Sequence, residues 1–218
     1  MVDFSKDYCN LNDWCCDKYL EGMSIKAVSV DDNSEITSFI HERNLRGYFL
    51  LHQKYFSQQK EQVQEKWLFI EPVFKKMIKR YFDYEFLYSV KVCFSLFSLY
   101  PRDLDNRQFM IPHDADWIIK KSVIIHEMLH LMFYDVCRQK GLKEDEVLWL
   151  TSELFVPLLF NYLNKSDDCL GNLTCSCYCL TDDLIEESTP VFEEDISMRK
   201  SLISIIEDLK SIVERVIQ

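Results

Sequence analysis

Glycine and proline are scarce in this 218-residue chain, which contains four of the former and five of the latter. Sandwiches and barrels of β-strands depend on many tight turns, so the scarcity of these residues disfavours both classes. Leucine, isoleucine, phenylalanine and lysine are plentiful, which favours helices. Because 48% of the residues are hydrophobic, we expect a single, mainly helical domain with a sizeable core.

Basic residues are also under-represented, since 25 Lys and Arg are opposed by 36 Asp and Glu, for a net charge of -11. Nucleic-acid binding depends on clustered Lys and Arg, so no nucleic-acid partner is expected. No stretch approaches 18 uninterrupted apolar residues, which disfavours a membrane-spanning helix. The beginning of the chain, MVDFSKDYCNLNDWCC, lacks the basic and apolar regions of a secretory signal. These features predict a cytoplasmic protein.

The nine cysteines are an odd number, and without a secretory signal they are expected to be free thiols. Four of them cluster in CLGNLTCSCYC, at Cys169, Cys175, Cys177 and Cys179. Their C-x-C-x-C spacing lacks the paired C-x₂-C units of structural zinc sites. Free thiols are the preferred interpretation of this cluster, with a second metal site and disulfides as alternatives.

Hydrophobic periodicity separates an N-terminal appendage, residues 1–33, from a domain of residues 34–218. Apolar residues recur at three- and four-residue steps over residues 35–64 and 66–82, which predicts two helices, with Pro72 marking where the second begins or bends. Partial alternation with β-branched and aromatic residues predicts a strand within residues 88–100. A loop at residues 101–114 follows, with a short return strand at 108–111.

The second half of the domain is predicted to be helical, apart from two polar segments. Its predicted elements are a helix at residues 115–139 that ends near Gly141, a helix at 143–164, a cysteine-rich loop at 167–180, a solvated acidic segment at 182–195 and a C-terminal helix at 196–217. The predicted class is therefore α+β, mainly helical, with a small sheet or hairpin.

Residues 123–133, VIIHEMLHLMF, place His126 and His130 four residues apart in an almost wholly apolar segment. On a helix, both rings leave the same face one turn apart, so that two imidazole nitrogens can bind one metal ion such as Zn²⁺. Glu127 lies about 100° around the helix, placed to reach a water on that ion. Burying these groups without partners would cost several kcal/mol, so a metal site is favoured over satisfied core histidines with a buried ion pair.

This H-E-x-x-H stretch, with Val123 and Ile124 before it and only uncharged residues around the pair, resembles the zincin metallopeptidases. The resemblance covers about a tenth of the chain. It implies that His126 and His130 are zinc ligands, that Glu127 is a general base, and that the reaction is hydrolysis of a peptide or protein substrate.

Subgroups of zincins differ in the third ligand. No histidine follows His130, which excludes the metzincin arrangement, whereas gluzincins use a glutamate of the next helix. In DEVLWLTSELFVPLLF, residues 145–160, Glu153 is a carboxylate in an apolar run, which is costly unless it is paired or bound to a cation. Glu146, seven residues earlier, is the alternative ligand. Pro157 occupies the position at which gluzincins have an aspartate that holds a histidine.

Two further questions stay open in the sequence. Tyr134, Tyr162 and His113 are candidates for a donor that stabilises the transition state, and the strand within residues 88–100 suits either a substrate-binding sheet edge or the core. The alternative to an enzyme is a non-catalytic or latent zinc-binding protein on a zincin scaffold that binds a peptide or protein partner. The presence of Glu127 favours the enzyme, because a structural zinc site needs no base.

Overall fold

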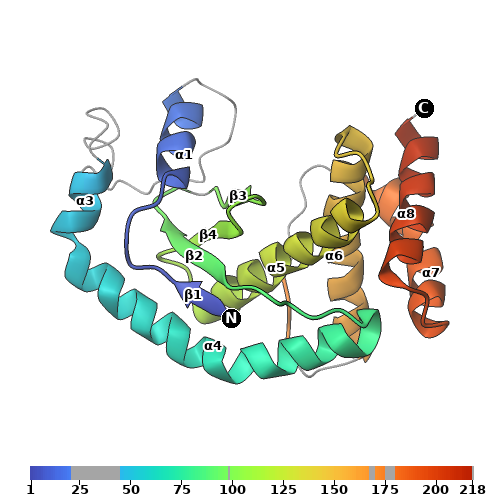
Figure 1. The fold of residues 1–218 in the computed structure, drawn as a ribbon, viewed down its shortest axis with the longest axis horizontal. Helices are drawn as coiled ribbons and strands as arrows, with labels where there is room; N and C mark the ends of the chain where they lie inside the picture. The colour runs from blue at the N-terminus through green and yellow to red at the C-terminus, as the bar shows by residue number, and fades with distance from the viewer. Residues whose placement is uncertain (21–44, 98, 167–169, 175–179, 218) are drawn as a thin grey trace. The chain divides into compact units, whose positions relative to one another are not determined.

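The computed structural model of the chain describes residues 1–20, 45–97, 99–166, 170–174 and 180–217 (Figure 1). These residues form two compact units. The first unit comprises Met1–Leu68 and Tyr88–Lys120, and the second comprises Phe69–Leu87 and Lys121–Gln218. The predicted boundary between residues 33 and 34 falls outside the described residues.

Helices dominate the described chain, and a small sheet accompanies them, which confirms the predicted α+β class. In chain order the elements are β1 (Val2–Phe4), α1 (Leu11–Leu20), α3 (Leu45–Leu51), α4 (Gln53–Phe82), β2 (Val90–Ser95), β3 (Arg102–Asp103), β4 (Gln108–Pro112), α5 (Trp117–Gln139), α6 (Glu146–Ser166), α7 (Asp182–Ser197) and α8 (Leu202–Ile217). Residues 1–20 therefore contribute a strand and a helix to the first unit, in the region predicted to be an appendage.

Four strands form one mixed sheet in the first unit, in the order β1, β2, β4, β3 (Figure 1). Strand β2 confirms the strand predicted within residues 88–100, and it pairs in parallel with both β1 and β4. The predicted return strand exists as β4, but it does not run antiparallel to β2. The chain reverses its direction twice, first between β2 and β3 and again between β3 and β4, where Arg107 adopts a positive φ of 50°. The antiparallel pair is therefore β3 with β4.

The core of the first unit lies over the two central strands. Val92 and Phe94 of β2 and Phe109 of β4 are buried, and the ring of Phe56 on α4 lies 6.0 Å from that of Phe94. Asn12, which is fully buried, connects α1 to the end of β2. Its amide nitrogen donates to the carbonyl oxygen of Phe94 at 3.2 Å, and its amide oxygen accepts the backbone N–H of Leu96 at 3.3 Å. The buried amide is thus satisfied at both ends.

Helix α4 is continuous over 30 residues, where the sequence predicted two helices that meet near residue 65. Its buried residues Val63, Trp67, Phe74 and Ile78 keep one helical phase through that point, so nothing in the packing interrupts the helix there. Within the described residues the break lies earlier, between α3 and α4. Pro72 lies inside α4 rather than at its start.

In the second unit, helices α6, α7 and α8 pack against one another (Figure 1). Helix α8 contributes a continuous apolar stripe at three- and four-residue spacing, formed by Leu202, Ile205, Ile206, Leu209, Ile212 and Val213. The ring of Phe192 on α7 packs edge-on against that of Phe155 on α6, with centroids 5.8 Å apart. These apolar contacts hold α6 in position and support the C-terminal half of α5.

Helix α7 occupies residues at which the sequence predicted a solvated acidic segment, 182–195. Leu184, Ser188, Phe192 and Ile196 recur every four residues and are buried, while most of the acidic side chains between them are exposed. Thr181 caps the helix by accepting the backbone N–H of Leu184. The many acidic residues of this segment and its internal proline outweighed the four-residue spacing of the buried positions in the sequence prediction. The C-terminal helix consequently begins at Leu202 instead of residue 196.

Two further predictions concern membranes and thiols. Within the described residues, no helix combines the length and the apolar character that crossing a bilayer requires.

The cluster of Cys169, Cys175, Cys177 and Cys179 lies outside the described residues. The described cysteines are free thiols, all of them buried: Cys9, Cys15, Cys16, Cys93 and Cys137.

Candidate metal centre

Helix α5, which carries the H-E-x-x-H pattern, has a well-defined cap at each end. Asp116 caps its start by accepting the backbone N–H of Ile119 at 3.0 Å, so the helix begins at Trp117, two residues later than predicted. Gly141 ends it with a φ of 70°, and the N–H of Leu142 donates to the carbonyl of Cys137 at 3.0 Å. This is a Schellman motif, and it confirms the predicted stop at Gly141.

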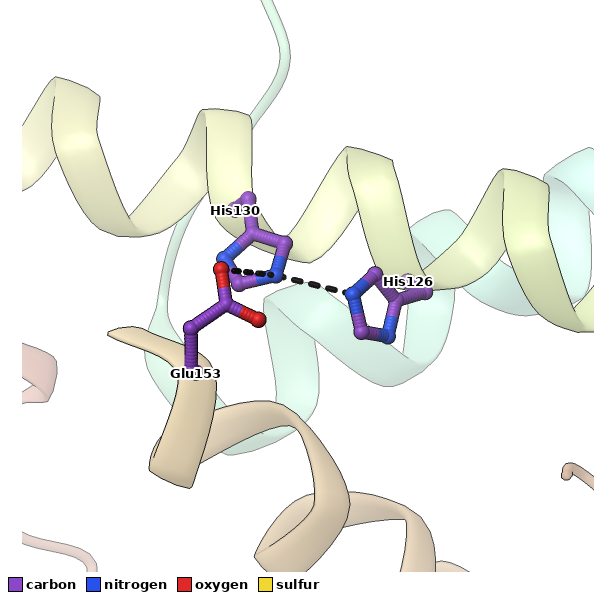
Figure 2. A group of neighbouring side chains, drawn as sticks. All are labelled: His126, His130 and Glu153. Atoms are coloured by element: carbon purple, nitrogen blue, oxygen red, sulfur yellow. Dashed lines mark hydrogen bonds and ion pairs between the residues drawn. The ribbon is translucent and has the colours of Figure 1, made fainter. Parts of the chain in front are cut away.

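The middle of α5 is anchored by its apolar residues. Leu129, Met132 and Phe133 are completely buried, and the Phe133 ring lies 5.8 Å from that of Phe155 on α6. His126 and His130 share one face of this helix, one turn apart (Figure 2). The side chain of His130 has no exposed area, whereas that of His126 is 18% exposed. The pair is therefore accessible only from the side of His126.

Helix α6 supplies the carboxylate. Asp145 caps it by accepting the backbone N–H of Leu148 at 3.0 Å, so the helix begins at Glu146 instead of residue 143. Glu153 lies two turns later, with a side chain that is 12% exposed. Pro157 has no N–H to donate to the backbone carbonyl of Glu153, so the helical hydrogen-bond ladder lacks this link at Glu153.

Figure 2 shows both histidine rings and the Glu153 carboxylate converging from α5 and α6. The two Nε2 atoms are 2.9 Å apart, and Nε2 of His130 lies 3.7 Å from Oε1 of Glu153. One nitrogen or oxygen atom from each residue lies within 4.8 Å of the other two. Ligands about 2.0 Å from one tetrahedral zinc ion are separated by about 3.3 Å, a value that falls between the two measured distances. The donor set therefore fits zinc in both chemistry and spacing.

Ser152 fixes the orientation of His130, a role that the sequence did not reveal. Its hydroxyl oxygen lies 2.5 Å from Nδ1 of His130, and both residues are completely buried. When Nδ1–H donates to this oxygen, the lone pair of Nε2 is available to a metal ion. The only sign of this role in the sequence is a small polar residue beside Glu153 in an apolar helix. A serine whose hydroxyl bonds to the backbone of its own helix gives the same pattern.

Glu127 lies next to the pair but outside the ligand group. Its side chain is 6% exposed, and its Oε1 is 3.9 Å from Nε2 of His126. The ring of Phe160 on α6 approaches His126 edge-on, with centroids 6.3 Å apart. An apolar wall therefore limits the positions available to the His126 ring.

The remaining candidates do not belong to the ligand group. Glu146 is exposed in the first turn of α6. Tyr162 packs edge-on against Tyr81 at 5.9 Å, and Tyr134 is buried on α5. His113 belongs to the first unit, where its Nδ1 lies 2.9 Å from the carbonyl oxygen of Ser95. Burial lowers the pKa of His113. None of these side chains, among the residues described, joins the group of His126, His130 and Glu153.

No protein-family model, no curated protein sequence and no solved structure matches this chain.

Proposed function

We propose that the chain is a zinc-dependent peptidase of the gluzincin type, acting on a peptide or protein substrate. The main support is the group formed by His126, His130 and Glu153, whose metal-binding atoms lie within 4.8 Å of one another. Three protein ligands leave a fourth position on a tetrahedral zinc ion, which is the arrangement of catalytic rather than structural sites. The nearby carboxylate of Glu127 supplies a base for hydrolysis.

A bound zinc ion supplies Lewis acidity, which polarises the scissile carbonyl and lowers the pKa of water. Glu127 accepts a proton from the attacking water and transfers it to the leaving amine. Because the Glu127 side chain is almost wholly buried, bulk water competes little for this proton. His130 keeps its Nε2 directed towards Glu153 through the hydrogen bond between Nδ1 and Ser152. No covalent bond forms between the peptide and a side chain.

The second candidate function is a non-catalytic zinc protein that uses the same three ligands and binds a peptide or protein partner. The deep burial of Glu127 favours this alternative, because a closed site restricts access to a substrate. Zinc would then stabilise the contact between α5 and α6. Both candidate functions require bound zinc, so a measurement of zinc content tests whether the metal centre exists. Substitution of Glu127 then tests which of the two functions the protein has.

The first experiment measures zinc. The purified protein should contain about one zinc ion per chain, because the three ligands form one site. His126→Ala should contain much less, since it removes one of three ligands. Elemental analysis of the two proteins, prepared together, makes the comparison. Equal zinc content in the two proteins would show that His126 is not a ligand of the metal ion, and the proposed function would then be wrong.

The second experiment measures hydrolysis. A peptide-library digest read by mass spectrometry should show cleavage by the wild type, and chelation should abolish it. Glu127→Gln should bind zinc but not cleave, because an amide does not accept the proton from water near neutral pH. Glu65→Gln, which changes an exposed glutamate of α4, is the matched control and should cleave normally. Zinc binding without cleavage by the wild type would support the non-catalytic alternative.

We propose the cytoplasm as the compartment of this protein. All five described cysteines are free thiols. Disulfides persist mainly in oxidising compartments, so buried and unbridged thiols fit a reducing one.

A further inference from the structure

The first unit contains a cavity of about 340 Å³ that is separate in sequence from the metal ligands. One wall is formed by Tyr55, Gln59, Val63 and Lys66 of α4, and the other by the segment from His113 to the first turn of α5. Its volume is at the lower end of the range found for small-molecule sites, about 300 to 1,000 Å³. We call it the Lys120 cavity, after the lysine of α5 that lines it.

Lys120 is a buried cation, with 5% of its surface exposed. Its Nζ donates to Oε1 of Gln59 at 2.7 Å and to the backbone carbonyl of His113 at 2.8 Å. The ring centroid of Phe94 lies 5.8 Å from the same atom. An ammonium group has three N–H donors, so these two acceptors leave one donor for another group.

No carboxylate among the described residues forms an ion pair with Lys120. The nearest acidic influences, from Asp114 and Asp116, oppose the effect of burial, yet burial is the larger effect and lowers the pKa of Lys120. A buried charge without a counter-ion is costly, because the loss of hydration is not repaid by an opposite charge. The cavity that Lys120 lines can admit an anion that supplies this missing charge.

The lining of the cavity restricts the kind of anion. Lys120 and Lys66 place two positive charges on the lining, and Asp114 and Asp116 place two negative ones, so the cavity favours a singly charged anion over one of higher charge. Most of the lining is polar, and the rings of Tyr55 and Trp117 supply its smaller apolar part. A planar carboxylate accepts hydrogen bonds readily from an ammonium group.

We propose that the Lys120 cavity binds a small monocarboxylate, whose carboxylate accepts the remaining N–H of Lys120. The proposal is independent of the proposed zinc chemistry, because the ligands of the metal centre belong to the other unit. The ligand class is defined by one negative charge and a body small enough for about 340 Å³.

Benzoate is the probe, and isothermal titration calorimetry of the full chain measures its binding. A chelator is present throughout, so that benzoate has no zinc ion to bind. The wild type should bind benzoate with a dissociation constant of about 1 mM or tighter. Benzamide, which has the same shape without the charge, and inorganic phosphate, which has more charge, should show no saturable binding. Absence of benzoate binding, or equal binding of benzamide, would overturn the proposal.

Lys120→Met tests the residue itself, because methionine keeps most of the length and removes the charge. It should weaken benzoate binding at least roughly tenfold, the effect of losing a charge-assisted hydrogen bond. Lys54→Met, on an exposed position of α4 that does not line the cavity, makes the same charge change and should bind as the wild type does. Equal affinity in Lys120→Met and Lys54→Met would refute the site.

Lys120→Met should fold, because replacing an uncompensated buried charge by an apolar group is often neutral or stabilising. Thermal unfolding checks this before the titrations. If this variant does not fold, Gln62→Trp decides the question in its place. Gln62 is exposed and lines the cavity, so a large ring there should block benzoate without disturbing the core. Unchanged affinity in Gln62→Trp would then exclude the cavity as the binding site.

Discussion

Nδ1 of His130 lies 2.5 Å from the hydroxyl oxygen of Ser152, and solvent reaches neither residue. The hydrogen bond joins α5 to α6 at the level of the proposed zinc ligands. When Nδ1–H donates in this hydrogen bond, the proton is held on Nδ1 and the lone pair of Nε2 is left for a metal ion. Ser152 thus gives His130 the kind of partner that a metal-binding histidine normally has.

The first prediction concerns this serine. Ser152→Ala should weaken zinc affinity about 10- to 100-fold, because the His130 ring loses the partner that sets its orientation and tautomer. Thr151→Ala is the matched control. Thr151 is also buried, but its hydroxyl donates to the backbone carbonyl of Val147, so zinc affinity should stay near the wild-type value. Competition titration with a chromophoric chelator measures both. Equal losses in the two variants would assign Ser152 a general packing role.

The second prediction separates the two glutamates of α6. Glu153→Gln should lose most of its zinc, because the neutral amide is a much poorer ligand than the carboxylate. Glu146→Gln should retain zinc and change only the helix-end electrostatics, at a cost of about 0.3 to 1 kcal/mol. Elemental analysis after dialysis and urea unfolding give the two readouts. Retention of zinc by Glu153→Gln, with loss in Glu146→Gln, would reverse the assignment.

The predicted ligands were accessible to sequence reasoning because their signals are local. His126 and His130 are one helical turn apart on the same face, and this spacing alone places both rings together. Glu153 is conspicuous as an isolated carboxylate in an apolar helix. Helices α5 and α6 were predicted for the same reason, since their apolar periods are long. Their starts were missed by two or three residues because the caps, Asp116 and Asp145, are each one of several adjacent acidic or polar residues.

The features that escaped prediction depend on distant partners or on mixed signals. Strand β1 has three residues and pairs with β2 across 88 positions of the chain, as in the register of Val2 with Val90. No local pattern contains that pairing. Helix α7 has a period of buried residues every four positions, but its acidic side chains and Pro190 outweighed it. Ser152 needs His130 from another helix before its hydroxyl has a distinctive role.

The third prediction tests a distant contact of this kind. Asn12→Ala should lower the free energy of unfolding by about 1 to 3 kcal/mol, because it leaves buried backbone groups of Phe94 and Leu96 without their partner. Gln64→Ala, at an exposed position of α4 in the same unit, should change stability by less than about 0.5 kcal/mol. Urea unfolding of both variants measures the difference. A loss in Asn12→Ala no larger than in the control would show that α1 is not needed for the stability of the sheet.

The last prediction concerns the pH dependence of stability through His113. Its side chain is 16% exposed, and burial lowers its pKa from the ordinary value of 6.5, although the nearby Asp114 and the carbonyl of Ser95 act in the opposite direction. Between the lowered pKa and 6.5, the unfolded chain binds a proton that the folded chain does not.

Stability linked to this group is therefore fully present above pH 6.5 and declines as the pH falls towards the folded pKa, by at most about 1.4 kcal/mol per pH unit. His113→Asn keeps an N–H donor for the carbonyl of Ser95 but does not titrate. Urea unfolding of both proteins with chelator present, from about pH 7.5 to about pH 5.5, isolates the contribution of His113, because His126 and His130 are common to both and cancel in the difference. The stability advantage of the wild type over His113→Asn should shrink on acidification. A difference that stays constant or grows would mean that His113 is as easily protonated in the folded protein as in the unfolded chain.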